Sequence, residues 1–184
     1  MPKVVDHELY RIELLDKSLA YFVAKGMAGV SMRELALSLS VSTGTLYHYF
    51  PTKEILFVSM VRHFVSIDAA EILEIAEARR GLFDLISYVS KKEDHFLSLI
   101  LLALDVKRHH GDSEELTDLL DESWNSYERV LSNFFGDQDS QFAGEAFLSF
   151  FVGALFLKST RSSDTSWSQL LEALGQVSSF LSFK

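Results

Sequence analysis

Cysteine is absent from the 184-residue sequence, which also has only two prolines and nine glycines. Without cysteine the chain can form neither a disulfide nor a thiolate-ligated zinc or iron–sulfur site, and it has no thiol nucleophile. Scarce proline and glycine leave little to interrupt helices, and the apolar residues recur at steps of three and four. Because no stretch alternates as a strand would, the sequence predicts an all-α fold.

Long apolar runs are missing as well. The longest uncharged, apolar-rich run is 146–157, and Ser149 interrupts it. That is shorter than the roughly 20 residues that a membrane-spanning helix needs. No apolar core follows a basic start, as it would in a secretory signal. We therefore expect a cytoplasmic protein with no membrane partner.

Basic side chains are outnumbered: 17 Lys and Arg stand against 26 Asp and Glu, a formal net charge of −9. Taken over the whole chain, this balance argues against a polyanionic partner such as nucleic acid. Residues 1–63, however, carry seven basic and six acidic side chains, a net charge of +1, which leaves −10 for residues 64–184. The acidic charge therefore belongs to the second part, and the first part could still bind DNA.

Helix boundaries are clearest near the start of the chain. Apolar spacing predicts a first helix over about residues 6–25, ended by Gly26. A capping box that begins at Ser31 starts a short second helix. Ser42 can cap a third helix, which Pro51 ends. Two short helices joined by a tight turn predict a helix-turn-helix.

The segment Gly26–Glu54, and above all VSTGTLYHYFPTKE at residues 41–54, resembles the DNA-binding domain of the tetracycline-repressor (TetR) family of bacterial transcriptional regulators. A small–Gly–small start of a helix, an aromatic pair and a Lys–Glu pair occur in the same order and spacing. The resemblance fades after Leu56. The family usually has glycine where this chain has Ser40, so Ser40 must adopt a conformation that is easy for glycine. Such a replacement costs on the order of 1 kcal/mol if the backbone angle is left-handed.

The residue types near the third helix suit recognition of the major groove. Gly44 costs about 1 kcal/mol relative to alanine inside a helix, and close approach to a partner would explain it. Thr45 can offer its hydroxyl to a base and its methyl group to thymine. Leu46 and Phe50 are expected to face inward, whereas Tyr47 suits the core and the DNA surface equally. The candidate DNA-contacting residues are Ser31, Met32, Arg33, Ser42, Thr43, Gly44, Thr45, Tyr47, His48, Tyr49 and Lys53.

Lys53 gives a second indication. A cation in the first turn of a helix is disfavoured by the helix dipole, so the presence of Lys53 there asks for an external anionic group. The resemblance implies that this group is a DNA phosphate, and it places Ser31, Met32 and Arg33 on the DNA backbone or groove edge. The alternative is that Arg33 and Lys53 are ordinary solvated charges.

The resemblance divides the chain into a helix-turn-helix DNA-binding domain, residues 1–51, and a helical effector-binding and dimerisation domain, residues 52–184. It also implies that the last two helices pair with their counterparts in a second subunit. Apolar spacing predicts helices in this part over about 52–78, 81–95, 94–108, 113–135, 140–159 and 166–183.

The last two predicted helices are too apolar for one small subunit to cover. We therefore predict a homodimer, although the same residues could form the core of a monomer. The candidate interface residues are Phe147, Phe150, Phe151, Ala154, Leu157, Trp167, Leu170, Leu171, Leu174, Val177 and Leu181.

Aromatic residues between the DNA-binding part and these helices suit a hydrophobic or planar effector, although packing is the favoured role for any single one of them. Asp105, His109 and His110 have metal-like spacing, but two groups one turn apart do not make a site. We expect no metal and no cofactor, and the role of these three residues is open. The candidate effector-binding residues are Phe64, Tyr88, Phe96, Trp124 and Tyr127.

Enzyme motifs are missing: the sequence has no Gly-rich phosphate loop, nucleophile elbow or zinc-protease motif. The sequence therefore predicts a transcriptional regulator, a repressor that binds a palindromic DNA operator as a homodimer and is released by a small-molecule ligand. The alternative is a helical dimer of the same fold that acts through protein–protein interaction and does not recognise a DNA sequence.

Overall fold

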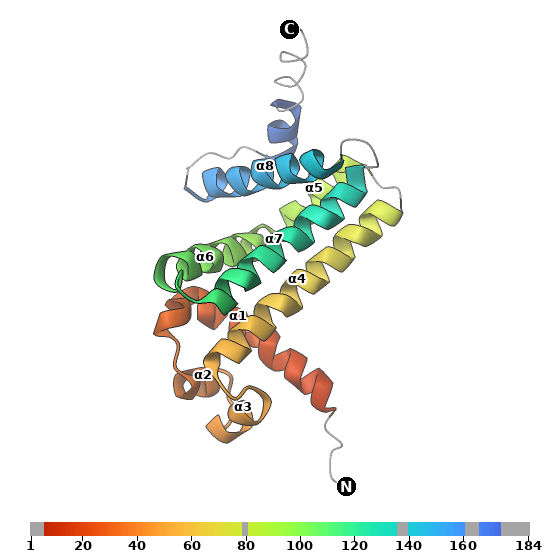
Figure 1. Ribbon diagram of the computed structural model, residues 1–184. Coiled ribbons are helices and arrows are strands. Elements are labelled where there is room, and N and C mark those ends of the chain that lie inside the picture. The colour runs from red at the N-terminus through yellow and green to blue at the C-terminus, as the bar shows by residue number, and fades with distance from the viewer. Residues whose placement is uncertain (1–5, 79–80, 136–139, 161–165, 174–184) are drawn as a thin grey trace. The chain divides into compact units, whose positions relative to one another are not determined.

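The computed structural model describes residues 6–78, 81–135, 140–160 and 166–173. Regular structure in these ranges is helical throughout (Figure 1), which confirms the all-α prediction. The helices are α1 (His7–Gly29), α2 (Met32–Ser38), α3 (Thr43–Tyr49), α4 (Lys53–Glu77), α5 (Leu82–Lys91), α6 (Glu93–His109), α7 (Glu114–Phe135) and α8 (Ser140–Thr160), and residues 167–173 are also helical.

The predicted interruption of the first helix at Gly26 is confirmed. The backbone there is not helical, with φ 67° and ψ 162°, and α1 consists of the helix before this kink and a short helical segment that continues to Gly29. One other predicted boundary was wrong. α5 ends at Lys91 instead of near residue 95, because α6 already begins at Glu93. The part of the last predicted helix beyond residue 173 lies outside the described residues.

By its internal contacts the chain divides into two compact units. The first unit is Met1–Ala69 with Ser98–Ser126, and the second is Ala70–Leu97 with Tyr127–Lys184. α1, α2 and α3 belong to the first unit, α5 and α8 belong to the second, and α4, α6 and α7 have residues in both. The division into two functional domains at residue 51 stays a prediction.

The core of the first unit holds the two short helices in place. Phe22 of α1 and Phe57 of α4 are buried and pack edge to face, with their ring centroids 5.2 Å apart. Leu35 of α2 and Leu46 of α3 are completely buried, and the two helices lie against each other. Figure 1 shows α2 and α3 as short neighbouring helices that follow α1. The predicted helix-turn-helix is therefore present.

The turn between α2 and α3 contains the predicted conformation. Ser40 has φ 59°, a positive angle at a residue that carries a side chain. The Ser40 amide donates to the Leu37 carbonyl at 3.1 Å, and the Val41 amide donates to the Ala36 carbonyl at 2.9 Å. These two bonds close the end of α2 and hold the left-handed residue in place, at a cost of about 1 kcal/mol.

α8 is longer than its uncharged apolar run suggested. The window Ala143–Thr160 has a mean hydropathy of 1.2 and is 28% buried, so by length and composition it could cross a membrane. One such helix is weak evidence, because helices that pack in a protein core pass the same test. Phe147, Phe151 and Leu155 of α8 are buried, which gives this helix one face in the core of the second unit.

Candidate nucleic-acid interface and effector region

The start of α2 is capped as the sequence predicted. The Ser31 hydroxyl accepts from the Glu34 amide at 3.3 Å and donates to the Glu34 carboxylate at 2.9 Å. Ser31 and Arg33 are exposed, but the side chain of Met32 is only 7% exposed. Met32 is therefore a core residue, and only its backbone could contact DNA.

α3 begins with a well-formed cap. The Ser42 hydroxyl accepts from the Thr45 amide at 2.9 Å and shares a hydrogen bond of 2.7 Å with the Thr45 hydroxyl. A hydroxyl has one donor and two acceptor positions, so Thr45 keeps capacity for another partner. Ser42 therefore fixes the orientation in which Thr45 could meet a base.

The outer face of α3 is open to solvent. Ser42, Gly44 and His48 are exposed, and Thr43, Thr45 and Tyr49 are partly exposed. Tyr47 is 48% exposed, which decides between the two interpretations of this residue in favour of the surface. Leu46 and Phe50 are completely buried, as predicted.

Packing inside the chain does not require glycine at position 44. A Cβ atom placed there would meet only the Ser42 hydroxyl oxygen, at an ordinary contact distance of 3.7 Å. Because glycine weakens a helix by about 1 kcal/mol relative to alanine, its presence calls for a reason outside the chain. Close approach of a partner surface to the exposed first turn of α3 would supply that reason.

Tyr49 is held by the start of α1, which the sequence analysis did not anticipate. The Tyr49 hydroxyl shares a hydrogen bond of 2.8 Å with Nδ1 of His7. The ring centroid of Tyr49 lies 5.5 Å from that of Tyr10 and 5.1 Å from that of His48. An aromatic residue one turn after His7 was the available signal, but nothing in the sequence showed that this turn faces α3.

Lys53 has partners inside the chain. Its ammonium group donates to the backbone carbonyls of Met27 at 3.2 Å and of Val30 at 3.4 Å. These carbonyls lie at the end of α1 and supply the negative partial charge that a cation in the first turn of α4 needs. The position of Lys53 therefore does not require an external anion, and contact with a DNA phosphate stays a prediction.

Three of the five candidate effector-binding residues come together in the second unit. The Phe96 ring is at the centre, with its centroid 5.9 Å from Tyr88 and 6.3 Å from Tyr127. Phe151 of α8 joins this aromatic cluster at 5.4 Å from Phe96. Phe96, Tyr127 and Phe151 are buried, so their rings contribute to packing. The other two candidates, Phe64 and Trp124, belong to the first unit.

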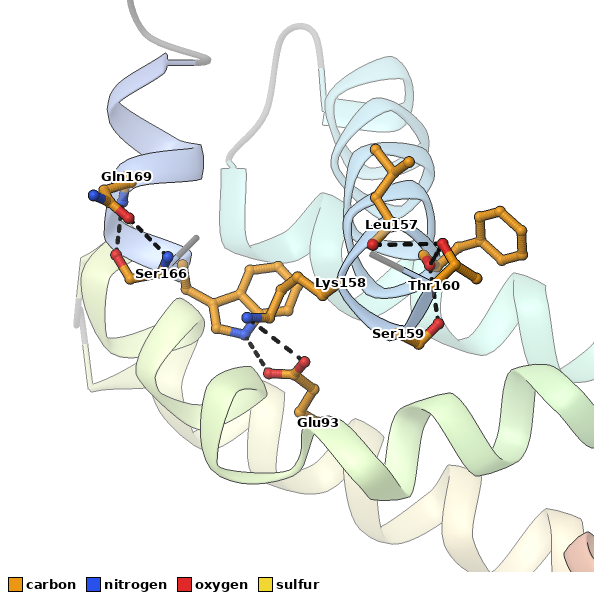
Figure 2. A network of polar contacts seen from close by, with 9 residues as sticks. Glu93, Leu157, Lys158, Ser159, Thr160, Ser166 and Gln169 are labelled. Atoms are coloured by element: carbon orange, nitrogen blue, oxygen red, sulfur yellow. Dashed lines mark hydrogen bonds and ion pairs between the residues drawn. The ribbon is translucent and has the colours of Figure 1, made fainter. Parts of the chain in front are cut away.

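Two ion pairs border this aromatic cluster. The Trp167 indole donates to the Glu93 carboxylate at 2.9 Å, and the Lys158 ammonium lies 3.7 Å from the same carboxylate (Figure 2). The Lys158 ammonium is also 5.7 Å from the centre of the Trp167 ring. Each cation–aromatic contact of this kind contributes about 0.5–1 kcal/mol at an exposed site.

The second ion pair has a similar arrangement. The Tyr88 hydroxyl donates to the Glu71 carboxylate at 2.9 Å, and Lys92 pairs with the same carboxylate. The Lys92 ammonium lies 4.9 Å from the centre of the Tyr88 ring. In both places a lysine occupies the face of an aromatic ring beside a carboxylate. The edge of the cluster is therefore charged although its centre is apolar.

Residues 14–60 match the model of the family described as bacterial regulatory proteins, tetR family. This segment, which includes α2 and α3, belongs to the family. Over 63 residues the chain is 36% identical to the transcriptional regulator BetI of Paraburkholderia xenovorans, and over 54 residues it is 38% identical to PksA of Bacillus subtilis. These matches cover 34% and 29% of this chain, and 32% and 26% of the relatives, so the chain matches a third or less of their length.

Solved structures resemble this chain over nearly its whole length. One is the reduced form of E. coli NemR, with a TM-score of 0.69 and 21% sequence identity. The superposition covers 91% of this chain and 95% of the NemR chain. Another is a transcriptional regulator from Saccharomonospora viridis in complex with choline, with a TM-score of 0.65 and 14% sequence identity. That superposition covers 92% of this chain and 95% of the regulator. At these identities the likeness shows the fold. The sequence matches are to transcriptional regulators, in agreement with the expectation that this chain is not an enzyme.

Burial within the single chain separates the candidate dimer-interface residues into two groups. Phe147, Phe151, Ala154 and Trp167 are buried within the single chain, so they form its own core and have little surface left for a partner. Phe150 is partly exposed, and Leu157 is 46% exposed. Leu170 and Leu171 are partly exposed, whereas Leu174, Val177 and Leu181 lie outside the described residues.

Asp105, whose role the sequence left open, has two partners within the chain. One Asp105 carboxylate oxygen accepts from the Met27 amide at 2.9 Å, and the other lies 3.9 Å from Nε2 of His109. Within the described part of the chain, no three His, Asp or Glu side chains are grouped so that they could hold a metal ion. Nε2 of His110 is buried there without a hydrogen-bond partner.

Proposed function

We propose that this chain is a DNA-binding transcriptional repressor that binds a palindromic operator as a homodimer and is released by a small-molecule ligand. The arrangement of α3 carries the proposal. Leu46 and Phe50 fasten one face of the helix to the core, while Gly44, Tyr47 and His48 are exposed on the other. A helix held in this way, with small residues on its first turn, suits insertion into the major groove.

Each exposed group then has a role that its chemistry supports. Thr45, oriented by Ser42, contacts a base edge with its hydroxyl or methyl group. Tyr47, His48 and Tyr49 reach flanking phosphates or bases with their polar ends. Arg33, exposed at the start of α2, offers a positive charge to a further phosphate, and such phosphate contacts position the protein on the duplex.

An exposed stripe on α8 supports the homodimer. Its residues recur at steps of three and four, so they share one face of the helix. Phe156 is 56% exposed, and a Cβ atom at Gly153 would meet nothing within 4 Å. Large exposed apolar groups beside small residues suit close packing against a second copy of the helix. The stripe consists of Ala146, Ser149, Gly153, Phe156, Leu157 and Thr160.

Dimerisation would let two copies of α3 bind the same DNA duplex. Two recognition helices about 34 Å apart, one turn of duplex, would match the two halves of a palindrome. An effector would release the DNA only to the extent that it binds the released state more tightly than the bound state. The aromatic cluster around Phe96 suits a hydrophobic or planar effector. The solved neighbour in complex with choline supports small-molecule binding within this fold.

DNA selection followed by salt titration tests the regulator hypothesis. The full chain is incubated with a random duplex library, and the retained duplexes are titrated against salt. The logarithm of the affinity should fall by roughly 0.9 for each phosphate contact per logarithm of salt concentration. If no duplex is retained above the non-specific background at any salt concentration, the regulator hypothesis is wrong. The alternative of an interaction protein with a TetR-family fold would then be favoured.

Two substitutions on α3 separate base contacts from backbone contacts. Thr45→Ala should change which duplexes are selected, because it removes a group placed at a base edge. Tyr49→Phe should weaken binding to every duplex alike, because it removes a hydroxyl that can contact a phosphate and that also holds Tyr49 to His7. Affinities are measured on the duplex that the wild-type protein selects and on single-base variants of it. Equal, sequence-independent effects of both substitutions would contradict the assignment of Thr45 to base recognition.

A further inference from the structure

The end of α1 is held from two sides at one residue, Met27. Its amide follows the bend at Gly26 and donates to the Asp105 carboxylate of α6 at 2.9 Å. Its carbonyl accepts from the Lys53 ammonium of α4 at 3.2 Å, and the Val30 carbonyl accepts from the same ammonium at 3.4 Å. One backbone residue thus connects α6 to the start of α4.

The fit around this residue is tight. A Cβ atom at Gly26 would lie 3.0 Å from both Asp105 carboxylate oxygens, and φ at Gly26 is +67°. Position 26 therefore requires glycine for its backbone angle and for the space that Asp105 occupies. Met27 and Val30 are buried, and the Asp105 side chain is 25% exposed. A carboxylate that accepts from a backbone amide forms a charge-assisted hydrogen bond, which is stronger than a neutral one.

We propose that Asp105 is a positioning residue for DNA binding. It fixes the bent end of α1, and through the carbonyls of Met27 and Val30 it fixes the Lys53 ammonium at the first turn of α4. α3 ends at Tyr49 and α4 begins at Lys53, so the position of Lys53 also constrains the end of the recognition helix. The proposal rests on the proposed DNA-binding function.

The alternative is that Asp105 only stabilises the fold, like any residue that caps a helical segment. The two roles differ in what they predict for Lys53. An ammonium has three donors, of which two point to carbonyls of α1. In the positioning role, loss of Asp105 lets these carbonyls shift, so the orientation of Lys53 changes and DNA affinity falls. In the purely stabilising role, the folded fraction falls but the folded protein binds DNA as before.

The test compares three variants of the full chain. Asp105→Ala removes the acceptor, Asp105→Asn keeps an oxygen at the same place, and His109→Ala changes the neighbour one turn away without touching the Met27 bond. Hydrogen exchange of the Met27 amide reports the bond itself. Affinity for the duplex that the wild-type protein selects, measured well below the unfolding temperature of each variant, reports its effect on DNA binding.

We expect Asp105→Ala to speed exchange of the Met27 amide and to weaken binding to the selected duplex, each by about tenfold. In Asp105→Asn, the exchange rate of the Met27 amide and the duplex affinity should both stay within about threefold of the wild-type values, because the amide oxygen of asparagine can accept the same hydrogen bond. His109→Ala should change neither. If Asp105→Ala speeds exchange while duplex affinity is unchanged, Asp105 is only a structural cap and the proposal is wrong.

A double substitution tests the connection through Lys53. Lys53→Met should weaken duplex binding, and adding Asp105→Ala should then weaken it little further, because both act through the same group. If the fold-losses in duplex affinity of the two single variants multiply in the double variant, the two residues act independently and the proposal is wrong. Should Asp105→Ala fail to fold, Asp105→Leu, which keeps a similar branched shape but has no acceptor, replaces it in the same comparison. Failure of the wild-type protein to retain any duplex would instead contradict the proposed function itself, and this proposal with it.

Discussion

α3 and α8 both present a candidate binding face, but their sequences specify that face in opposite ways. α3 has seven residues, a side-chain cap at Ser42 and two buried anchors, Leu46 and Phe50. α8 has 21 residues and is apolar almost all around, so that Phe151 is buried while Phe156 is exposed. Contrast between polar and apolar residues shows which side of α3 faces outward. Without such contrast, only the packing of α8 against its neighbours decides the face.

Removing an anchor of α3 should have the largest effect on stability. Leu46→Ala leaves a cavity in the core of the first unit and should lower the free energy of unfolding by about 2–5 kcal/mol. Tyr47→Ala, at the next position but on the exposed side, should change it by less than about 0.5 kcal/mol. Urea unfolding followed by circular dichroism measures both. Similar losses for the two variants would mean that α3 is not fastened through one face.

The exposed stripe of α8 can be tested by placing a charge in it. Phe156→Asp should weaken dimerisation by about 2 kcal/mol or more, because it would bury a carboxylate at the centre of the proposed interface. Sedimentation equilibrium gives the dissociation constant.

The matched control is Phe83→Asp, which makes the same chemical change at a residue of α5 that is 74% exposed. It should leave the dimer intact. Dissociation by Phe83→Asp, or an unchanged dimer with Phe156→Asp, would place the interface elsewhere.

The cap of α3 should contribute less than its anchors. Ser42→Ala removes the acceptor of the Thr45 amide and should lower the free energy of unfolding by about 1 kcal/mol. Ser90→Ala changes an exposed serine within α5 and should alter stability by less than about 0.5 kcal/mol. Thermal unfolding of the two variants, side by side with the wild-type protein, makes the comparison. Equal stabilities would show that the capping bond contributes nothing net.

The turn before α3 offers the smallest predicted change, and one of opposite sign. Ser40→Gly removes the side chain from a residue with φ 59°, which relieves the strain of the left-handed angle. Glycine also gives the unfolded chain more conformational entropy, which offsets part of this gain. The net result should be a rise of about 0.5 kcal/mol in the free energy of unfolding. Ser40→Val places a branched side chain at the same angle and should lower it. The two variants are compared by urea unfolding. A loss of stability in both would indicate that the Ser40 side chain itself is needed.

Prediction from sequence succeeded where a signal is local. The caps at Ser31 and Ser42 depend on residues within a few positions of one another, and the spacing of Leu46 and Phe50 predicted which side of α3 faces inward. The positive φ at Ser40 was expected from the family resemblance. Prediction failed where partners are distant: His7 meets Tyr49 across 42 positions and Asp105 meets Met27 across 78. Periodicity cannot show which turns of two distant helices touch, because that depends on how the helices pack.

The sequence alone therefore determined that the chain is helical, where its short helices begin and end, and which side of α3 faces outward. Tertiary structure decided which side of α8 is left exposed, that Lys53 is bound to the end of α1, and that Asp105 fastens this end to α6. The physical reason is the range of the interactions. Caps and turns satisfy backbone groups within one helical turn, whereas burial depends on the packing of residues far apart in the chain.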